Sequence, residues 1–136
     1  MLLDVNVLVA LLWASHDHHE RARRWLRPKA ILATCPLVQL GFARISSLPM
    51  LGFAASPEHA FATLRRFFAD PRHRFIPDDL AADERSLFTE DIRTANSVND
   101  HYLAALARKH GLTLGTFDGE LSRAFRHEPG LVELIP

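Results

Sequence analysis

Three aspartates occupy points in the sequence where an expected strand gives way to a helix, and acids in such places can hold a metal ion. Asp4 ends the apolar stretch MLLD, and Asp118 follows the apolar segment 112–116. Asp100 stands in the first turn of a helical pattern that leads into that segment. Carboxylates that converge repel one another unless a positive charge holds them together. Because the donors are oxygen atoms, these residue types favour Mg²⁺ or Mn²⁺ over zinc.

Each aspartate also has an ordinary structural explanation. Asp118 can cap the helix that begins after it, and Asp100 can be a first-turn acid that the helix dipole favours. Asp4 is harder to explain, because a carboxylate among buried apolar residues is costly when nothing compensates its charge. A structural salt bridge is the main alternative to a metal ion at Asp4. The combination of all three acids favours the metal site.

Short apolar strands alternate with helices along the chain, and these elements must bring the acids together. Strands are expected at 1–4, 30–33, 75–76, 112–116 and 131–135, and helices at 7–13, 20–27, 36–45, 83–94, 99–109 and 120–125, with a further helix after Ser56-Pro57-Glu58. The alternation is typical of an α/β fold with a parallel sheet covered by helices on both faces. The length suggests one domain over 1–136. In such sheets ligands bind beyond the carboxyl ends of the strands, where the acids are expected.

Composition limits the classes of function without choosing among them. The chain has 136 residues with 16 Lys and Arg against 16 Asp and Glu, so net charge favours neither the presence nor the absence of a nucleic acid partner. The single cysteine, Cys35, excludes an internal disulfide and a cysteine zinc site, and it fits the reducing cytoplasm. No apolar run approaches the ~18 residues of a membrane span, so no membrane association is expected.

Four fragments of the chain carry a resemblance through their order and spacing. They are LLDVNVLVAL, TCPLVQLGFARI, VNDHYLAALARKHG and LGTFDGEL. Together they resemble the PIN-domain ribonucleases, and more narrowly the VapC-type toxins of bacterial toxin–antitoxin pairs. The resemblance covers nearly the whole chain, and it implies a PIN-like three-layer α/β/α fold with a central parallel sheet.

The resemblance also implies a function and a set of site residues. Asp4, Asp100 and Asp118 would bind one or two Mg²⁺ or Mn²⁺ ions that activate water to cut RNA, with single-stranded RNA or tRNA as the substrate. Asn6 and Thr116 match polar positions that hold the acids or a metal-bound water, although Asn6 can equally be a cap for the first helix. A cognate small antitoxin and a homodimer are the partners that the family implies.

The chain departs from the family pattern at Gln39, where a glutamate is usual. Glutamine keeps a carbonyl oxygen but removes one negative charge, and fewer acids weaken the binding of a hard dication. Gln39 has three possible interpretations. It is a tolerated variation in an active nuclease, or it marks a weakened module that binds antitoxin or RNA without efficient cleavage, or it is an engineered change. We favour the first, because the other acids and both accessory polar residues remain. Asp4, Gln39, Asp100 and Asp118 are thus the expected catalytic set.

Cations and aromatic rings elsewhere offer further candidates for RNA contact. Arg44, on the same helix as Gln39, is the first candidate to bind the RNA backbone. The arginines and lysine at 21–29 form a solvated helix face or an electrostatic footprint for RNA or an acidic antitoxin tail. The segment HDHH at 16–19 suggests zinc, but it lacks an HExxH arrangement, so a solvated turn with a weaker possibility of RNA contact is preferred. Five phenylalanines are assigned to the core, with an oligomer interface as the alternative for some of them and a base-stacking platform as the less favoured one: Phe61, Phe67, Phe68, Phe75 and Phe88.

Overall fold

A computed structural model of the chain describes residues 1–81, 92, 95 and 97–136. Within these residues five parallel strands form one sheet in the order β3–β2–β1–β4–β5. They are β1 (Leu2–Leu3), β2 (Leu32–Thr34), β3 (His73–Phe75), β4 (Leu114–Thr116) and β5 (Val132–Leu134). Strand order runs outward from β1 in both directions, so the order reverses between β1 and β4.

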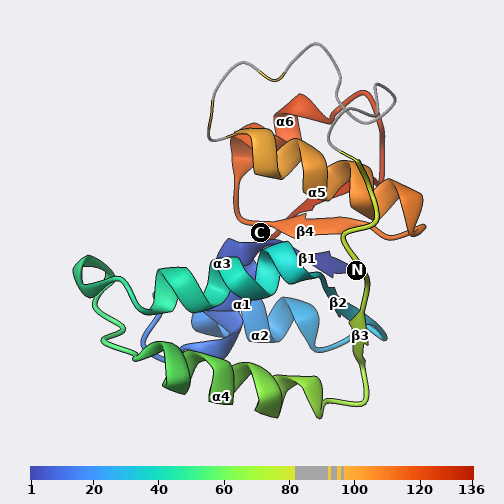
Figure 1. The fold of residues 1–136 in the computed structure, drawn as a ribbon. Helices are drawn as coiled ribbons and strands as arrows, with labels where there is room; N and C mark the ends of the chain where they lie inside the picture. Colours follow the sequence, from blue (N-terminus) through green and yellow to red (C-terminus); the bar gives the residue numbers. More distant parts are fainter. Residues whose placement is uncertain (82–91, 93–94, 96) are drawn as a thin grey trace.

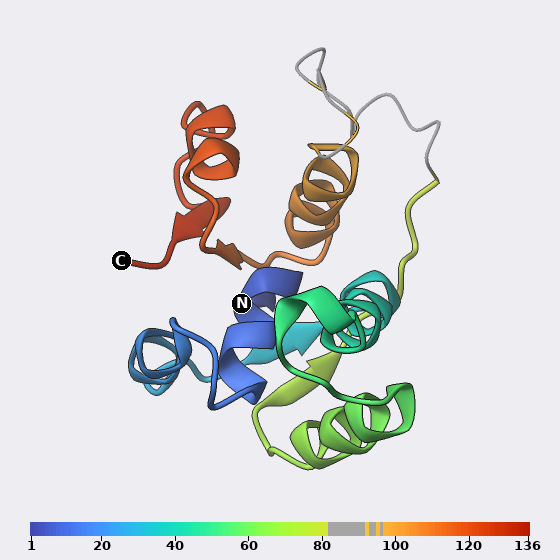
Figure 2. The same cartoon turned by 90° about the vertical axis from the view of Figure 1, so that its left-hand side faces the viewer.

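Helices cover both faces of the sheet, as the sequence predicts. They are α1 (Val5–Leu12), α2 (His19–Leu26), α3 (Pro36–Ser46), α4 (Pro57–Phe68), α5 (Ser97–Lys109) and α6 (Gly119–Ala124), with a short 3₁₀ turn η1 (Pro49–Leu51). Figures 1 and 2 show α5 and α6 together on one side of the sheet and α1 to α4 on the other. The predicted α/β class, with three layers around a central parallel sheet, is confirmed.

The strands are apolar without alternation because both of their faces are covered. Leu2, Leu3 and Leu114 are completely buried in the core. Helices α1 and α3 pack closely beside them, and Gly41 permits this approach, because a Cβ at that position would lie 2.8 Å from Val5 Cγ2. The Trp13 indole nitrogen, just after α1, donates to Ser46 Oγ at the end of α3 at 2.7 Å. These contacts fix the start of α1, and therefore Asp4, relative to α3.

Several boundaries differ from the prediction for local reasons. Helix α1 begins at Val5 rather than at residue 7, because the Asp4 carboxylate accepts from the Val5 amide at 2.6 Å and so caps the helix. The helix expected at 83–94 lies outside the described residues, except for Ile92, which is not helical. Among the described residues no helix is long and apolar enough to cross a membrane.

The expected aromatic core is wrong in part. Phe67 is buried at 7% exposure, but Phe61, Phe68 and Phe75 are 41%, 36% and 56% exposed. Phe75 lies on β3, which is an edge strand, and the other two lie on the solvent side of α4. The spacing of these residues predicts an apolar side of α4 and β3, but it does not show how much of that side other elements cover. Phe88 lies outside the described residues.

Candidate active site

The register of β1 and β4 brings Asp4 beside Thr116. Leu3 pairs with Gly115, and the Asp4 amide donates to the Gly115 carbonyl at 3.0 Å. Both strands end here, at the point where strand order reverses. In open parallel sheets this point is the usual position of a ligand site, because the neighbouring connections diverge to opposite faces.

Thr116 is the centre of a hydrogen-bond network that holds Asp4. Its hydroxyl donates to Asp4 Oδ2 at 2.6 Å, and it accepts from Asn6 Nδ2 at 3.2 Å and from the Asp118 amide at 3.0 Å. One donor and two acceptor positions are therefore all used. Asn6 Oδ1 in turn accepts from the Phe117 amide at 3.2 Å. Asp4 is 5% exposed and Thr116 is completely buried, so the network lies within the protein.

The other two aspartates reach this edge from separate elements. Asp118 caps α6, since its Oδ1 accepts from the Glu120 and Leu121 amides at 2.7 and 3.2 Å. Asp100 lies in the first turn of α5. Asp118 is therefore a helix cap, as its ordinary structural explanation predicts. The cap uses only Oδ1, so this role does not exclude a further ligand at the other carboxylate oxygen.

The three carboxylates influence one another electrostatically. Burial raises the pKa of Asp4, and the charge of Asp118 raises it further, against hydrogen bonds from Thr116 and Val5 that lower it. Burial also raises the pKa of Asp100 to about 6, with additional contributions from the charges of Asp4 and Asp118. Burial and neighbouring acids thus disfavour the ionised forms of Asp4 and Asp100, and a nearby cation would relieve this cost.

Asp4 and Asp100 line one cavity of about 330 Å³, together with Asn99, Arg44 and Leu40. Its oxygen donors suit a hard divalent cation. Among the residues that the structure describes, however, no three His, Cys, Asp or Glu side chains are arranged around a common point as metal ligands. The donor set thus fits Mg²⁺ or Mn²⁺ by chemistry and charge.

Gln39 lies on α3 near the same edge of the sheet but is engaged elsewhere. Its Nε2 donates to Thr34 Oγ1 at 3.0 Å, and Thr34 Oγ1 lies 2.9 Å from His73 Nε2. Gln39 is absent from the residues that line the cavity of Asp4 and Asp100. The amide therefore connects α3 to β2 and β3, and burial lowers the pKa of His73 at the end of this chain of contacts.

Gln39 does not line the cavity, so Gln39→Glu can add a ligand charge only if its carboxylate turns from Thr34 toward Asp4 and Asp100 when Mn²⁺ binds. We expect this turn and a gain in Mn²⁺ affinity of about tenfold, because hard-cation affinity increases with the number of ligand charges. The second expected effect concerns the metal-free protein. A carboxylate cannot donate to Thr34, so the Thr34 hydroxyl would donate to it and the His73 pKa would rise. Calorimetric Mn²⁺ titration and histidine NMR would measure the two effects. The matched variant Gln39→Met removes the amide without adding charge and should leave Mn²⁺ affinity unchanged. Equal Mn²⁺ affinity in all three proteins would contradict the role expected for this position.

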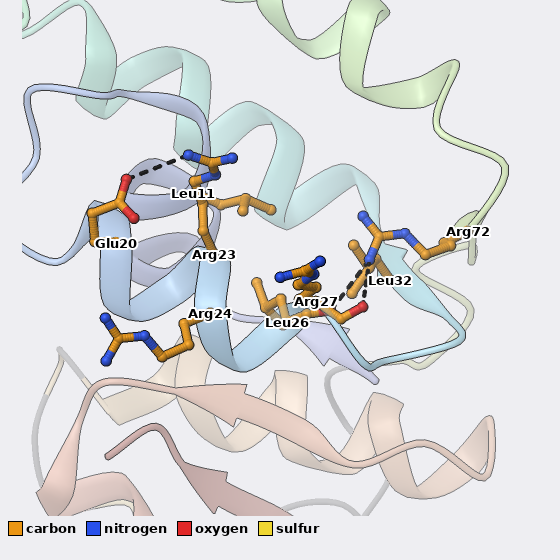
Figure 3. Close-up of a pocket in the computed structure, with 8 residues that line it drawn as sticks. All are labelled: Leu11, Glu20, Arg23, Arg24, Leu26, Arg27, Leu32 and Arg72. Atoms are coloured by element: carbon orange, nitrogen blue, oxygen red, sulfur yellow. Dashed lines mark hydrogen bonds and ion pairs between the residues drawn. The ribbon is translucent and has the colours of Figure 1, made fainter.

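The cations separate into two groups. Arg44 is exposed and lines the cavity with Asp4 and Asp100. By contrast, Arg23 and Arg24 of α2 and Arg27 just after it line a different pocket, shown in Figure 3. Arg72, just ahead of β3, and Leu32, the first residue of β2, also line this pocket. This pocket lies at the amino ends of those strands, opposite the acids. Arg72 is held there by Asp70 at 2.7 Å and donates to the Leu26 carbonyl at 3.3 Å, so it secures the end of α2.

The zinc interpretation of HDHH receives no support from the geometry. His16 Nδ1 accepts from the His18 amide at 3.0 Å, and His19 Nδ1 lies 2.9 Å from the Ala10 carbonyl oxygen. The His18 ring packs against Phe117 at 5.0 Å. The three rings point to separate partners rather than to one ion.

Sequence reasoning does not find three residues that help to position α3, which are Thr34, His73 and Asp78. Thr34 accepts from Gln39 and lies 2.9 Å from His73 Nε2, and nothing in the local sequence of either residue indicates these contacts. Asp78 Oδ2 accepts from the Leu37 amide at 2.9 Å and so caps the first turn of α3 from the segment after β3. An acid that follows a strand was the signal used for Asp4 and Asp118, and the same signal would have found Asp78.

Comparisons with known proteins place this arrangement in a family. A family model described as the PIN domain matches residues 1–126. Ribonuclease VapC38 of Mycobacterium tuberculosis is 40% identical over 141 residues, which cover 98% of this chain and 96% of that protein. The chain belongs to the VapC ribonucleases of the PIN-domain family. Ribonuclease VapC39 of the same organism is 37% identical over 138 residues, with 98% of each chain covered.

Solved structures agree with this VapC-type fold. VapC20 of Mycobacterium tuberculosis, described as a toxin that cleaves the sarcin–ricin loop, superposes with a TM-score of 0.70 at 22% identity, covering 99% of this chain and 98% of its own. VapBC2 of Rickettsia felis, solved with a DNA fragment from its promoter, gives a TM-score of 0.57 at 17% identity with 99% and 98% coverage. At these identities the likeness shows the fold alone.

Proposed function

We propose that this VapC-type chain is a Mg²⁺-dependent endoribonuclease, with Mn²⁺ as an alternative ion, and that it acts as the toxin of a toxin–antitoxin pair. The observation that carries the proposal is the electrostatic coupling of Asp4, Asp100 and Asp118 where strand order reverses. The names of the ribonuclease relatives support RNA as the substrate. Single-stranded RNA or an exposed part of a tRNA is the substrate form that we propose.

The residues of the site divide the work among them. Asp4, Asp100 and Asp118 would hold the ion, which when bound lowers the pKa of a water and neutralises charge on the phosphoryl oxygens. Thr116 fixes the orientation of Asp4, and Asn6 fixes Thr116. Arg44, exposed at the cavity, is positioned to bind an RNA phosphate.

Removal of divalent ions is expected to abolish cleavage. Purified protein treated with EDTA should leave a fluorescent single-stranded RNA intact, and added Mg²⁺ or Mn²⁺ should restore cleavage, because the acids alone cannot supply the positive charge. Gel analysis of the end-labelled RNA measures the rate. Undiminished cleavage in EDTA would contradict metal dependence.

A second candidate function follows from Gln39, whose side chain is hydrogen-bonded to Thr34. Without a fourth acid, the chain could be a weakened PIN module that binds antitoxin or RNA without efficient cleavage. Such a module would bind RNA with normal affinity while cleavage stayed near background in saturating Mg²⁺ or Mn²⁺. The two candidates therefore differ in turnover rather than in binding.

The remaining proposals concern organisation and partners. We propose that residues 1–136 form one PIN domain, that a cognate small antitoxin binds it, and that it works in the cytoplasm. The solved VapBC2 assembly is consistent with an antitoxin partner. We also propose a homodimer, since Met50 and Leu40 are 84% and 61% exposed and such apolar surface suits an interface.

A further inference from the structure

Four rings form a continuous row across the α1–α2 connection, which we call the aromatic ribbon: Phe53, His16, His18 and Phe117. The Phe53 and His16 rings are 6.0 Å apart and nearly parallel, with 5° between their planes. His16 and His18 are 5.6 Å apart, and His18 and Phe117 are 5.0 Å apart. All four side chains are partly exposed, and the Arg21 guanidinium lies over the Phe117 ring at 5.3 Å from its centroid, so a ligand would contact the parts of the rings that remain exposed.

One end of the aromatic ribbon meets the candidate active site. Phe117 directly precedes Asp118, and its amide donates to Asn6 Oδ1 at 3.2 Å. Asn6 in turn donates to Thr116, which holds Asp4. A ligand lying along the ribbon would therefore extend directly to the carboxylates.

The other end opens into a pocket of about 370 Å³. Asn6, His16 and Phe53 line it, with Val9 and Ile45 supplying apolar surface. Ser15 and Asp17 also line it, and no lysine or arginine does. The pocket thus offers flat rings and hydrogen-bonding groups but no cation for a phosphate.

Contacts within the protein orient the His16 and Phe53 rings. His16 Nδ1 accepts from the His18 amide at 3.0 Å, which orients the His16 ring. The Phe53 ring stacks on the Trp13 ring, with 6.2 Å between the two centroids. Burial, followed by the charge of His18, lowers the pKa of His16, which favours the neutral form of its ring. A ring that is already held in place loses less entropy on stacking.

We propose that the aromatic ribbon is a stacking platform for unpaired bases of RNA, and that its pocket takes a base beside the phosphate that is cut. Single-stranded RNA is commonly recognised by aromatic side chains that stack on splayed bases. A base fits the pocket better than a phosphate does, because the pocket lacks cations. This inference rests on the proposed ribonuclease function and specifies how that site selects its substrate.

The test compares Phe53→Ala and His16→Ala with the original protein on short single-stranded RNAs. Each variant should raise KM about tenfold with kcat nearly unchanged, because one stacked base is lost and the acids are untouched. His16→Phe, which keeps a ring, should restore KM. Phe61→Ala, which removes an exposed ring from α4 outside the ribbon, is the matched control and should have no effect.

An abasic substrate makes the test specific for stacking. Removing the base beside the cut should lower the RNA affinity of the original protein. The RNA affinity of Phe53→Ala should not change, because this variant has already lost the stacking contact. Fluorescence anisotropy in EDTA measures RNA affinity without cleavage, so the inference is tested even if the ribonuclease proposal fails. Unchanged RNA affinity in both alanine variants would overturn the inference. The same result is expected if the aromatic ribbon binds a protein segment rather than RNA.

Discussion

Asp100→Asn is expected to abolish RNA cleavage and, without metal, to make the protein more stable at pH 7.5. Loss of a metal-binding charge should reduce the cleavage rate at least about a hundredfold. The gain in stability follows from the pKa of Asp100, which the folded state raises from 3.8 to about 6. The Asp100 carboxylate is partly exposed, so the expected gain is about 1–2 kcal/mol rather than the full value of the shift.

The sign of the pH dependence follows from the same shift. A raised pKa means that the folded protein favours protonated Asp100. Ionisation of Asp100 therefore destabilises the folded state increasingly as pH rises from about 4 through 6, and this effect is complete above that range. In thermal melts, the melting temperature of Asp100→Asn should therefore be higher than that of the original protein at pH 7.5 and equal to it near pH 4. Glu58→Gln, an exposed acid of α4, is the control and should change neither cleavage nor the pH dependence. Retained cleavage in Asp100→Asn would contradict the assignment.

Thr116→Val is expected to cost about 2–4 kcal/mol of unfolding free energy and to slow cleavage strongly. Valine matches the shape of threonine but cannot donate to the Asp4 carboxylate, which then remains buried with one oxygen unpaired. The Asn6 amide loses its acceptor in the same substitution. Urea denaturation measures the stability, and the RNA assay measures the rate.

Two related variants separate the hydrogen bond from general effects on β4. Thr116→Ser keeps the hydroxyl and should retain most of the stability and activity. Thr113→Val removes a hydroxyl just ahead of the strand that donates only to the Gly130 carbonyl, and it should cost much less. If Thr116→Val and Thr113→Val lowered the unfolding free energy equally, the hydrogen bond from Thr116 to Asp4 would not contribute the stability that we expect of it.

The sequence predicts the parts of this molecule that depend on local patterns. Unbroken apolar strands indicate a parallel sheet with covered faces, and the positions of Asp4 and Asp118 after two strands indicate its carboxyl edge. Burial is the main cause of the raised pKa values of Asp4 and Asp100, and the charge of Asp118 contributes to both shifts, so these acids lie within electrostatic range of one another. Local patterns also gave Ser56 as the cap of α4, which the structure confirms.

Features that depend on distant pairing could not be predicted from one sequence. The hydrogen bond from Asn6 to Thr116 joins residues 110 positions apart, and it exists only because β1 and β4 are neighbours. Thr34 on β2 accepts from Gln39 on α3 and also lies 2.9 Å from His73 Nε2 on β3, so its two contacts depend on how these three elements pack. Exposure of Phe75 likewise depends on β3 being an edge strand, a fact of sheet order rather than of spacing.

Asp4 serves two neighbours at once, since one of its oxygens caps α1 and the other accepts from Thr116. Each of these oxygens has a second lone pair, so an ion bound to Asp4 would share the carboxylate with the Val5 amide and the Thr116 hydroxyl. The charge of the ion would then change the hydrogen bond that caps α1. The NMR shift of the Val5 amide would therefore report whether the site is occupied.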